Sequence, residues 1–279
     1  MKIVKKYIDM HVHVGSWSPE GTVFSKNLLL DVMRKNDVSA FCISTLDCID
    51  MNLQTKLTPK PEIDGNRDLV EMFCDIPEAQ FVCVCEPNNG SAKDIRKLLE
   101  DYPEKFCALK LHPLCHCIPA NSELYNPYME VAQEYGLPCL FHSGHVDCEY
   151  SSPRLIYELA KRYKDVPVIL GHLSTGGLSS KKEAVKIMKR AKDSGDANLY
   201  ADISWCDMES VVKAVAKVGE DRIMFATDAP LGVFGDAEHY AHFADAVERA
   251  IINGFEERAE EVLEKVFYSN AKNLFGIAD

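Results

Sequence analysis

The sequence predicts an α/β protein that folds as a single (β/α)8 TIM barrel over residues 1–279. Three observations predict it. Eight short apolar runs are bounded by turn-forming residues, amphipathic stretches with helical spacing separate them, and no Gly/Ser-rich linker or low-complexity segment divides the chain. Strand–helix alternation in a chain of 279 residues favours one barrel over a doubly wound sheet.

The expected strands are almost continuously apolar, which is typical of parallel strands buried on both faces. They comprise residues 7–13, 41–46, 81–86, 106–111, 138–143, 167–172, 199–204 and 223–228. Four of the stretches between them read as amphipathic helices, at residues 25–39, 91–102, 151–165 and 207–219.

Local signals support two of these helices. Ser152 and Asp207 are expected N-caps, Pro153 suits a first helical position, and Gly219 is a stop signal. The least regular connection, residues 47–64, follows the second strand. Long loops at the C-terminal face of a barrel cover substrates, so we expect a lid there.

Composition narrows the class of protein. The net charge of −12 argues against nucleic acid or an anionic membrane as a partner, because phosphates are repelled without a local basic patch. No apolar stretch has the length of a signal peptide or a membrane span, so we expect a soluble cytoplasmic protein with a small-molecule substrate. The oligomeric state is not fixed by the sequence, and a homodimer remains open.

The chain has 11 cysteines, an odd number, and most lie in apolar strand-like runs. Reduced thiols in the cytoplasm fit this pattern better than a secreted disulfide framework. Cys115 and Cys117 flank His116, but no CxxC pair accompanies them. We therefore interpret them as a small apolar residue and a loop thiol, and not as metal ligands.

Polar residues interrupt the apolar strands near their C-terminal ends. His11 and His13 are two residues apart and share a face, with Asp9 one step deeper. The other strands contribute Lys110 and His112, His142, His172, and Asp228. Burying these groups around one mouth would cost several kcal/mol unless something neutralised them.

A divalent cation neutralises such a set. Imidazole nitrogens and a carboxylate oxygen are ligands that zinc accepts, so zinc is preferred, although iron or manganese would also fit. His11 and His13 are then two ligands from one strand, and Asp9 is a candidate to orient their rings.

Six short motifs together resemble those of a known protein family. They are "DMHVH", "LKLHP", "LFHSG", "VILGHLSTGG" and "DRIMFATDAP", on successive expected strands, and "SNAKNLFGI" near the C-terminus. The chain resembles the amidohydrolase superfamily, in the branch of metal-dependent TIM-barrel hydrolases and decarboxylases that includes aminocarboxymuconate-semialdehyde decarboxylase. The resemblance covers nearly the whole chain in the same order.

The resemblance implies a metal-dependent hydrolase. By position, His11, His13, His142 and Asp228 would bind the first ion, and His172 would act as an acid or electrophile or hold a second ion. Asp228 would also take a proton from metal-bound water, which attacks an ester, lactone or amide carbonyl of a small molecule. A non-oxidative decarboxylase or a hydratase of a small carboxylic acid is the alternative on the same site, and a non-catalytic metal-binding protein is a third.

The resemblance leaves three roles open for Lys110. In binuclear members of the superfamily such a lysine is carboxylated and bridges two ions; otherwise it meets a substrate carboxylate, or forms a structural ion pair. One ion is favoured, and two are expected if Lys110 is carboxylated.

Other residues are candidates for the pocket. His112, His116 and His145 follow strand ends and would line the pocket or lie in solvated loops. Trp205 would form an apolar wall. Asp202 would accept hydrogen bonds at the mouth or anchor a loop, and Arg154 would clamp an anion or stay at an exposed helix start.

Overall fold

The computed structural model describes residues 4, 6–17, 22–49, 59–145 and 148–278. Nine strands form one sheet in the order β2-β1-β3-β4-β5-β6-β7-β8-β9. They are β1 (Ile8–Trp17), β2 (Thr22–Phe24), β3 (Ala40–Thr45), β4 (Ala79–Val84), β5 (Phe106–Leu111), β6 (Cys139–Phe141), β7 (Val168–Leu170), β8 (Leu199–Asp202) and β9 (Ile223–Met224).

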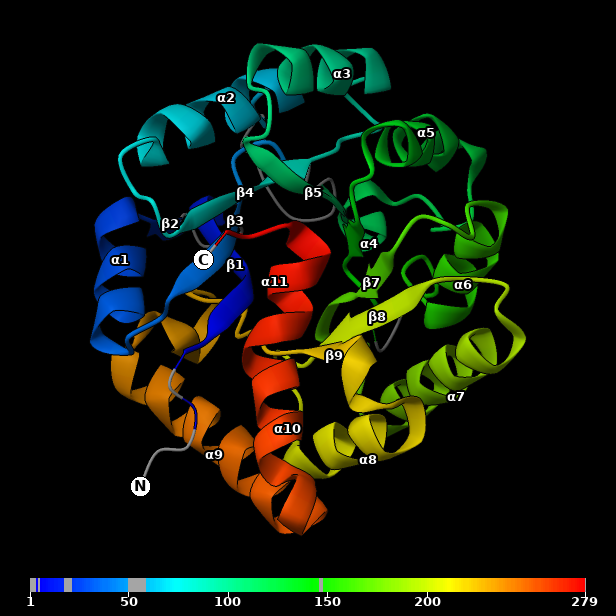
Figure 1. Ribbon diagram of the computed structural model, residues 1–279. Coiled ribbons are helices and arrows are strands. Elements are labelled where there is room, and N and C mark those ends of the chain that lie inside the picture. The colour runs from blue at the N-terminus through cyan, green and yellow to red at the C-terminus, as the bar shows by residue number, and fades with distance from the viewer. Residues whose placement is uncertain (1–3, 5, 18–21, 50–58, 146–147, 279) are drawn as a thin grey trace.

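Helices follow the strands and surround the sheet (Figure 1). They are α1 (Lys26–Lys35), α2 (Glu62–Phe73), α3 (Ala92–Asp101), α4 (Pro113–His116), α5 (Asn126–Tyr135), α6 (Pro153–Arg162), α7 (Leu178–Ser194), α8 (Met208–Val218), α9 (Ala237–Phe255), α10 (Ala259–Glu264) and α11 (Asn270–Phe275). Among the described helices, none combines the length and apolar composition needed to cross a bilayer.

The parallel strands close on themselves. Neighbours from β1 through β3 to β9 pair in parallel. The chain after β9 then pairs with β1: Asp228 N donates to His11 O at 2.9 Å and His13 N donates to Ala229 O at 2.7 Å. These bonds complete a (β/α)8 barrel, and the predicted TIM-barrel fold is confirmed.

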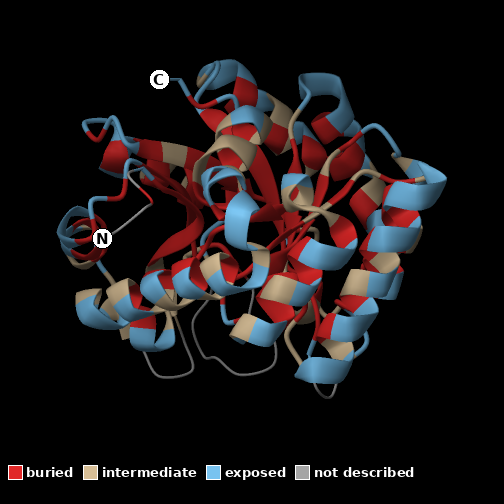
Figure 2. Cartoon of the chain, turned by 60° about the horizontal axis from the view of Figure 1, so that its bottom comes forward, coloured by how far each residue is buried: buried red, intermediate tan, exposed pale blue. Residues whose placement is uncertain are grey.

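The barrel interior is apolar toward the N-terminal ends of the strands. Met10, Cys42, Leu140, Ile169 and Met224 pack together there, and α11 covers the N-terminal end of the strands through Phe275. In Figure 2 the strands are buried, whereas the outer faces of the helices are exposed. This packed base leaves the C-terminal end as the place for a site.

The predicted strands all occur, with three differences. β1 runs on to Trp17 and forms an unpredicted antiparallel hairpin with β2. β7 ends at Leu170, and the short 3-10 helix η2 (Gly171–Leu173) carries His172. The expected eighth strand is short, but its pairing with β1 extends to Ala229.

The predicted helix signals are also present. The Ser152 side chain accepts Leu155 N, the Asp207 side chain accepts Ser210 N, and Gly219 ends α8. The irregular connection predicted at 47–64 is shorter, because α2 begins at Glu62. Residues 50–58 of this expected lid lie outside the described part of the chain.

Candidate active site

A cavity of about 310 Å³ lies at the C-terminal end of the barrel. Its polar lining consists of His13, Lys110, His112, His142, His172 and Asp228, and its other lining of Trp17, Leu46, Ile49, Thr175, Trp205, Leu231 and Gly232. A larger cavity of about 880 Å³ lies at the opposite end, beside residues 273–278, and neither histidine nor lysine is among its described lining. Four of the histidines, the lysine and one of the aspartates singled out in the sequence therefore gather in the smaller cavity.

Two histidines of β1 meet a carboxylate from the segment that follows β9, on the other side of the barrel closure. His13 Nε2 lies 3.0 Å and His11 Nε2 3.4 Å from Asp228 Oδ1. All three residues are buried, and their ligand atoms lie within 4.8 Å of one another. Both imidazoles thus turn the same ring nitrogen toward one oxygen atom.

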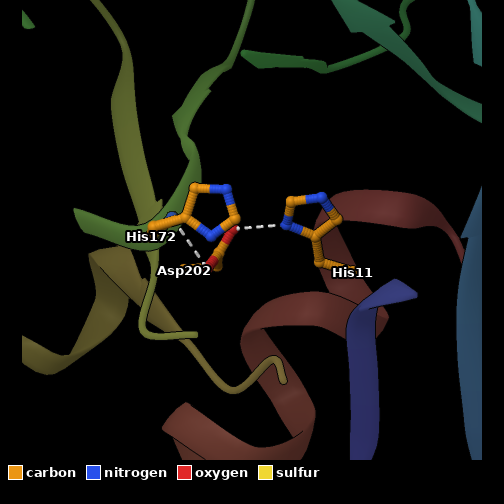
Figure 3. Close-up of side chains that lie close together, drawn as sticks. All are labelled: His11, His172 and Asp202. Carbon is orange, nitrogen blue, oxygen red and sulfur yellow. Dashed lines mark hydrogen bonds and ion pairs between the residues drawn. The ribbon is translucent and has the colours of Figure 1, made fainter. Parts of the chain in front are cut away.

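Asp202, at the end of β8, joins His11 to His172 (Figure 3). Its Oδ2 lies 3.0 Å from His11 Nδ1, and its Oδ1 accepts the backbone N–H of His172 at 2.9 Å. His11, His172 and Asp202 form a second group of buried ligand atoms within 4.8 Å. His11 belongs to both groups.

His172 and His142 lie against each other. His142 Nδ1 is 3.1 Å from His172 Nε2, and His172 Nδ1 is 2.8 Å from Ser204 Oγ. His172 has a φ of 63°, a left-handed conformation that is costly for a non-glycine residue. Its backbone bond to Asp202 helps to hold the turn that aims its ring into the site.

Lys110 points at the same centre. Its Nζ lies 2.8 Å from His11 Nε2. Burial lowers the pKa of Lys110 to about 8, although the Asp228 and Asp202 carboxylates act in the opposite direction. The amine is therefore mostly protonated at pH 7.

Burial sets the charge of the histidines. It lowers the pKa of His11, His112 and His142 well below the usual value, and that of His172 to about 4. These rings are neutral at neutral pH, so each has one nitrogen with a free lone pair.

Asp228 is held as a carboxylate. Burial acts to raise its pKa, but His11, His172 and His13 outweigh burial and keep the pKa below its ordinary value. Trp205 Nε1 donates to Asp228 Oδ2 at 2.8 Å, which leaves Oδ1 to face the imidazoles. The centre therefore offers one negative charge together with imidazole lone pairs.

This donor set fits a divalent cation. Neutral imidazoles and a carboxylate are suitable ligands. In addition, His142 Nε2 is buried and has no hydrogen-bond partner among the described residues. A buried ring nitrogen without a partner is costly, and a cation would satisfy it in the tautomer that leaves its lone pair free. The residues that could hold an ion are His11, His13, His142, His172, Asp202 and Asp228.

Of the three predicted substrate residues, two line the cavity and one does not. His112 lines the cavity and stacks on His142, with ring centroids 4.2 Å apart. Trp205 lies at the mouth and is 41% exposed, whereas His145 is exposed and outside the cavity lining.

Of the residues in the segment 115–117, His116 differs from its prediction, whereas Cys115 agrees with it. His116 neither lines the cavity nor is solvated: it is buried, with Nδ1 2.9 Å from Tyr125 Oη and Nε2 3.4 Å from Glu86 Oε2. Cys115 packs in a small apolar cluster with Leu46 and Cys48, as a small apolar residue should.

The expected orienting role of Asp9 is not what its contacts show. Its carboxylate accepts Thr227 Oγ1 at 2.6 Å, and accepts from the His11 backbone N–H, not its ring. Asp202 bonds the His11 ring instead. Arg154 remains at an exposed helix start, paired with Glu158 at 2.9 Å.

Two serines were not predicted. Ser44 Oγ lies 2.8 Å from His13 Nδ1, and Ser204 Oγ lies 2.8 Å from His172 Nδ1. Ser204 had a signal in the sequence, since it is two residues after Asp202, the same spacing as His11 and His13. Ser44 also interrupts an expected apolar strand near its C-terminal end, but a hydroxyl is not a usual zinc ligand, so its residue type indicated no role in the site.

Comparison with known proteins assigns the chain to a protein family. Residues 8–277 match the family model described as "Amidohydrolase". No curated protein sequence matches the chain.

Solved structures with the same fold include enzymes of two kinds. A 2,6-dihydroxybenzoate decarboxylase from Rhizobium has a TM-score of 0.67 and 14% identity, covering 98% of each chain. A dihydroxybenzoic acid decarboxylase from Polaromonas, with bound manganese and the inhibitor 2-nitroresorcinol, has a TM-score of 0.68 and 13% identity, covering 98% of this chain and 97% of that one.

The second kind is a hydrolase. A probable 2-pyrone-4,6-dicarboxylic acid hydrolase from Acinetobacter baumannii, with citric acid bound, has a TM-score of 0.64 and 12% identity, covering 97% of this chain and 99% of that one. Family and ligand cluster together support a divalent metal ion as the cofactor. The chain belongs to the amidohydrolase family and is an enzyme of the amidohydrolase superfamily.

Proposed function

We propose that the protein is a metal-dependent hydrolase of a small molecule that carries a carboxylate beside an ester, lactone or amide bond. The observation that supports this most is the approach of His11 Nε2 and His13 Nε2 to Asp228 Oδ1, at 3.4 and 3.0 Å, beside a cavity. A divalent ion bound there would supply an activated water molecule and would polarise the substrate carbonyl.

We assign His11, His13, Asp228 and His142 as the residues that hold the ion. His142 contributes through Nε2, the atom that lacks a protein partner. Zinc is our first choice, because imidazole and carboxylate suit it, although such ligands also suit manganese. Elemental analysis of purified protein tests this assignment: the double variant His11→Ala, His13→Ala should retain less metal than wild type, and equal stoichiometry would contradict it.

Asp228 is the general base in this proposal. Its Oδ1 faces the ligand cluster and accepts the proton of the attacking water, while Trp205 holds Oδ2. The proton that Asp228 accepts passes to the leaving group as the acyl bond breaks, which returns Asp228 to its carboxylate form.

Lys110 binds the substrate carboxylate. It is the one lysine in the described cavity lining, and Trp17, Leu46, Ile49 and Leu231 provide apolar walls for the rest of the substrate. A carboxylated Lys110 bridging two ions is the alternative, and ¹³C NMR of protein in ¹³C-bicarbonate distinguishes the two by the presence of a carbamate carbon.

Non-oxidative decarboxylation is the second candidate function. The position of Lys110 supports decarboxylation as much as it supports hydrolysis, because an ammonium group in the cavity selects substrates with a carboxylate. Metal-loaded protein should be assayed on lactones, esters and amides for release of acid, and on aromatic or unsaturated acids for release of CO₂. Acid release alone supports hydrolysis, CO₂ alone supports decarboxylation, and inertness on the whole panel contradicts both.

We also propose that residues 1–279 act as one domain in the cytoplasm. The pairing of β1 with the chain after β9 joins the two ends of the barrel, which supports one domain. None of the 11 cysteines forms a disulfide, which suits a reducing compartment.

A further inference from the structure

Asp202 lies behind the candidate site and accepts hydrogen bonds from one proposed ligand, His11, and from His172 and Ser204. Its Oδ2 is 3.0 Å from His11 Nδ1. Its Oδ1 accepts the backbone N–H groups of His172 at 2.9 Å and Ser204 at 3.0 Å, and the Ser204 hydroxyl at 2.5 Å. Asp202 is completely buried, so these groups are its surroundings in place of water.

A carboxylate accepts hydrogen bonds and does not donate them, and this fixes the direction of each bond around it. On the first branch, His11 must donate through Nδ1–H. The His11 Nε2 lone pair is then left to face Lys110 and Asp228.

The second branch is longer. Ser204 gives its hydroxyl proton to Asp202, so its oxygen accepts from His172 Nδ1–H at 2.8 Å. His172 Nε2 therefore carries a lone pair and accepts from His142 Nδ1–H at 3.1 Å. The chain ends at His142 Nε2, a buried lone pair with no partner among the described residues.

We propose that Asp202 and Ser204 are positioning residues that place the ring proton of His11, His172 and His142 on Nδ1, so that the Nε2 lone pairs of His11 and His142 face the site where a cation would bind. One carboxylate would thus prepare two ligands from different strands. Such outer partners fix tautomer and ring orientation, and their loss commonly costs 10–100-fold in metal affinity. The effect on metal binding rests on the proposed function, whereas the tautomers do not.

Ser44 provides a matched control within the same barrel mouth. Its hydroxyl lies 2.8 Å from His13 Nδ1, the same separation as between Ser204 and His172. Ser44→Ala and Ser204→Ala therefore remove the same group from an imidazole at the same distance. Only Ser204→Ala interrupts the series of hydrogen bonds that begins at Asp202.

The test is ¹H–¹⁵N NMR of histidine-labelled, metal-free protein, which reports the protonated nitrogen of each ring. We expect Nδ1–H on His11, His172 and His142 in wild type. Ser204→Ala should redistribute the proton on His172 and His142 while leaving His11 unchanged; Ser44→Ala should leave all three unchanged. Ser204→Thr, which keeps the hydroxyl, should restore the wild-type tautomers if it folds.

A second readout is metal affinity by competition with a chelator. We expect Asp202→Asn and Ser204→Ala to bind Zn²⁺ at least about tenfold more weakly than wild type. Nε2–H on His142 in wild type, or unchanged His172 and His142 tautomers in Ser204→Ala, would overturn the inference. Failure of the proposed function looks different: the tautomers would be as stated, but the protein would be inert on the substrate panel.

Discussion

Asp228 shows how much one residue can connect. Its Oδ1 faces both β1 histidines, its Oδ2 accepts Trp205 Nε1–H, and its backbone N–H donates to His11 O at 2.9 Å. It has a φ of 69°, in the left-handed region that non-glycine residues rarely adopt. Residues held in such conformations gather at functional sites, and here the strain turns the carboxylate to the imidazoles.

Replacing Asp228 by Asn keeps its size and removes its charge. An amide is a poor proton acceptor, so we expect kcat/KM of metal-loaded protein to fall about 10²–10⁴-fold while the far-UV circular dichroism stays that of wild type. Steady-state kinetics on the substrate found in the panel provide the measurement. A rate equal to that of wild type would remove Asp228 from the mechanism.

Lys110 predicts a pH dependence of substrate binding. Because burial lowers its pKa to about 8, the ammonium that binds a carboxylate is lost as the pH rises through 8. We expect KM for an anionic substrate to rise above pH 8, by up to about tenfold per pH unit.

Lys110→Gln is the control for this prediction. The variant should have a higher KM at pH 7 and no rise of KM above pH 8, because no charge remains to be lost. A wild-type KM that is constant from pH 7 to 9.5 would contradict a role for the Lys110 ammonium.

At the scale of elements, apolar runs revealed the strands because parallel barrel strands are buried on both faces. What they did not reveal is where each strand stops. β7 ends at Leu170 because the chain turns at Gly171, whose missing Cβ would lie 2.8 Å from Phe141 O. The left-handed turn of His172 depends on a bond to Asp202, thirty residues later. No local pattern contains that information.

The site was predictable to the extent that strand alternation applies. The two-residue spacing brings His11 and His13 to one centre, but it misplaces Asp9. The pairing of β1 with β3 is irregular between Asp9 and Val12, and the Asp9 carboxylate accepts a hydrogen bond from Thr227, in the segment after β9. A bulge breaks the alternation on which the prediction depended, and such an irregularity has no clear mark in the sequence.

The start of α2 makes a prediction about stability. The buried Glu62 carboxylate accepts the backbone N–H groups of Glu86 at 2.7 Å and Ser91 at 2.5 Å, and Tyr128 Oη donates to it at 3.3 Å. Glu62 thereby holds the connection between β4 and α3. Glu62→Ala would leave buried donors without an acceptor, so we expect the free energy of unfolding to fall by about 2–4 kcal/mol.

Urea unfolding of this variant against Glu71→Ala tests the prediction. Glu71 lies on the same helix and is exposed, so its loss should change the free energy of unfolding by no more than about 0.5 kcal/mol. Equal stability of the two variants would show that the Glu62 bonds contribute nothing.

At the scale of the whole molecule, the barrel buries neutral histidines. The pKa values of His11, His112, His116, His142 and His172 are all lowered, primarily by burial. Below pH 6.5 the unfolded chain therefore binds more protons than the folded one, and stability falls as the pH falls. Asp9 and Glu62, whose pKa values burial raises to about 7, act in the opposite direction over this range. Because the five histidines outnumber these two carboxyl groups, we expect acid to lower the free energy of unfolding.

His116 isolates one of these contributions, because it lies outside the cavity and its pKa is lowered to about 3. One proton difference changes the free energy of unfolding by about 1.4 kcal/mol per pH unit. In metal-free protein, we expect wild-type stability to fall between pH 6 and 4, and the slope in His116→Asn to be smaller by about that amount. Urea unfolding at pH 6, 5 and 4 measures both slopes. Equal slopes would mean that Glu86, 3.4 Å from His116 Nε2, keeps His116 protonated in the folded protein in spite of its burial.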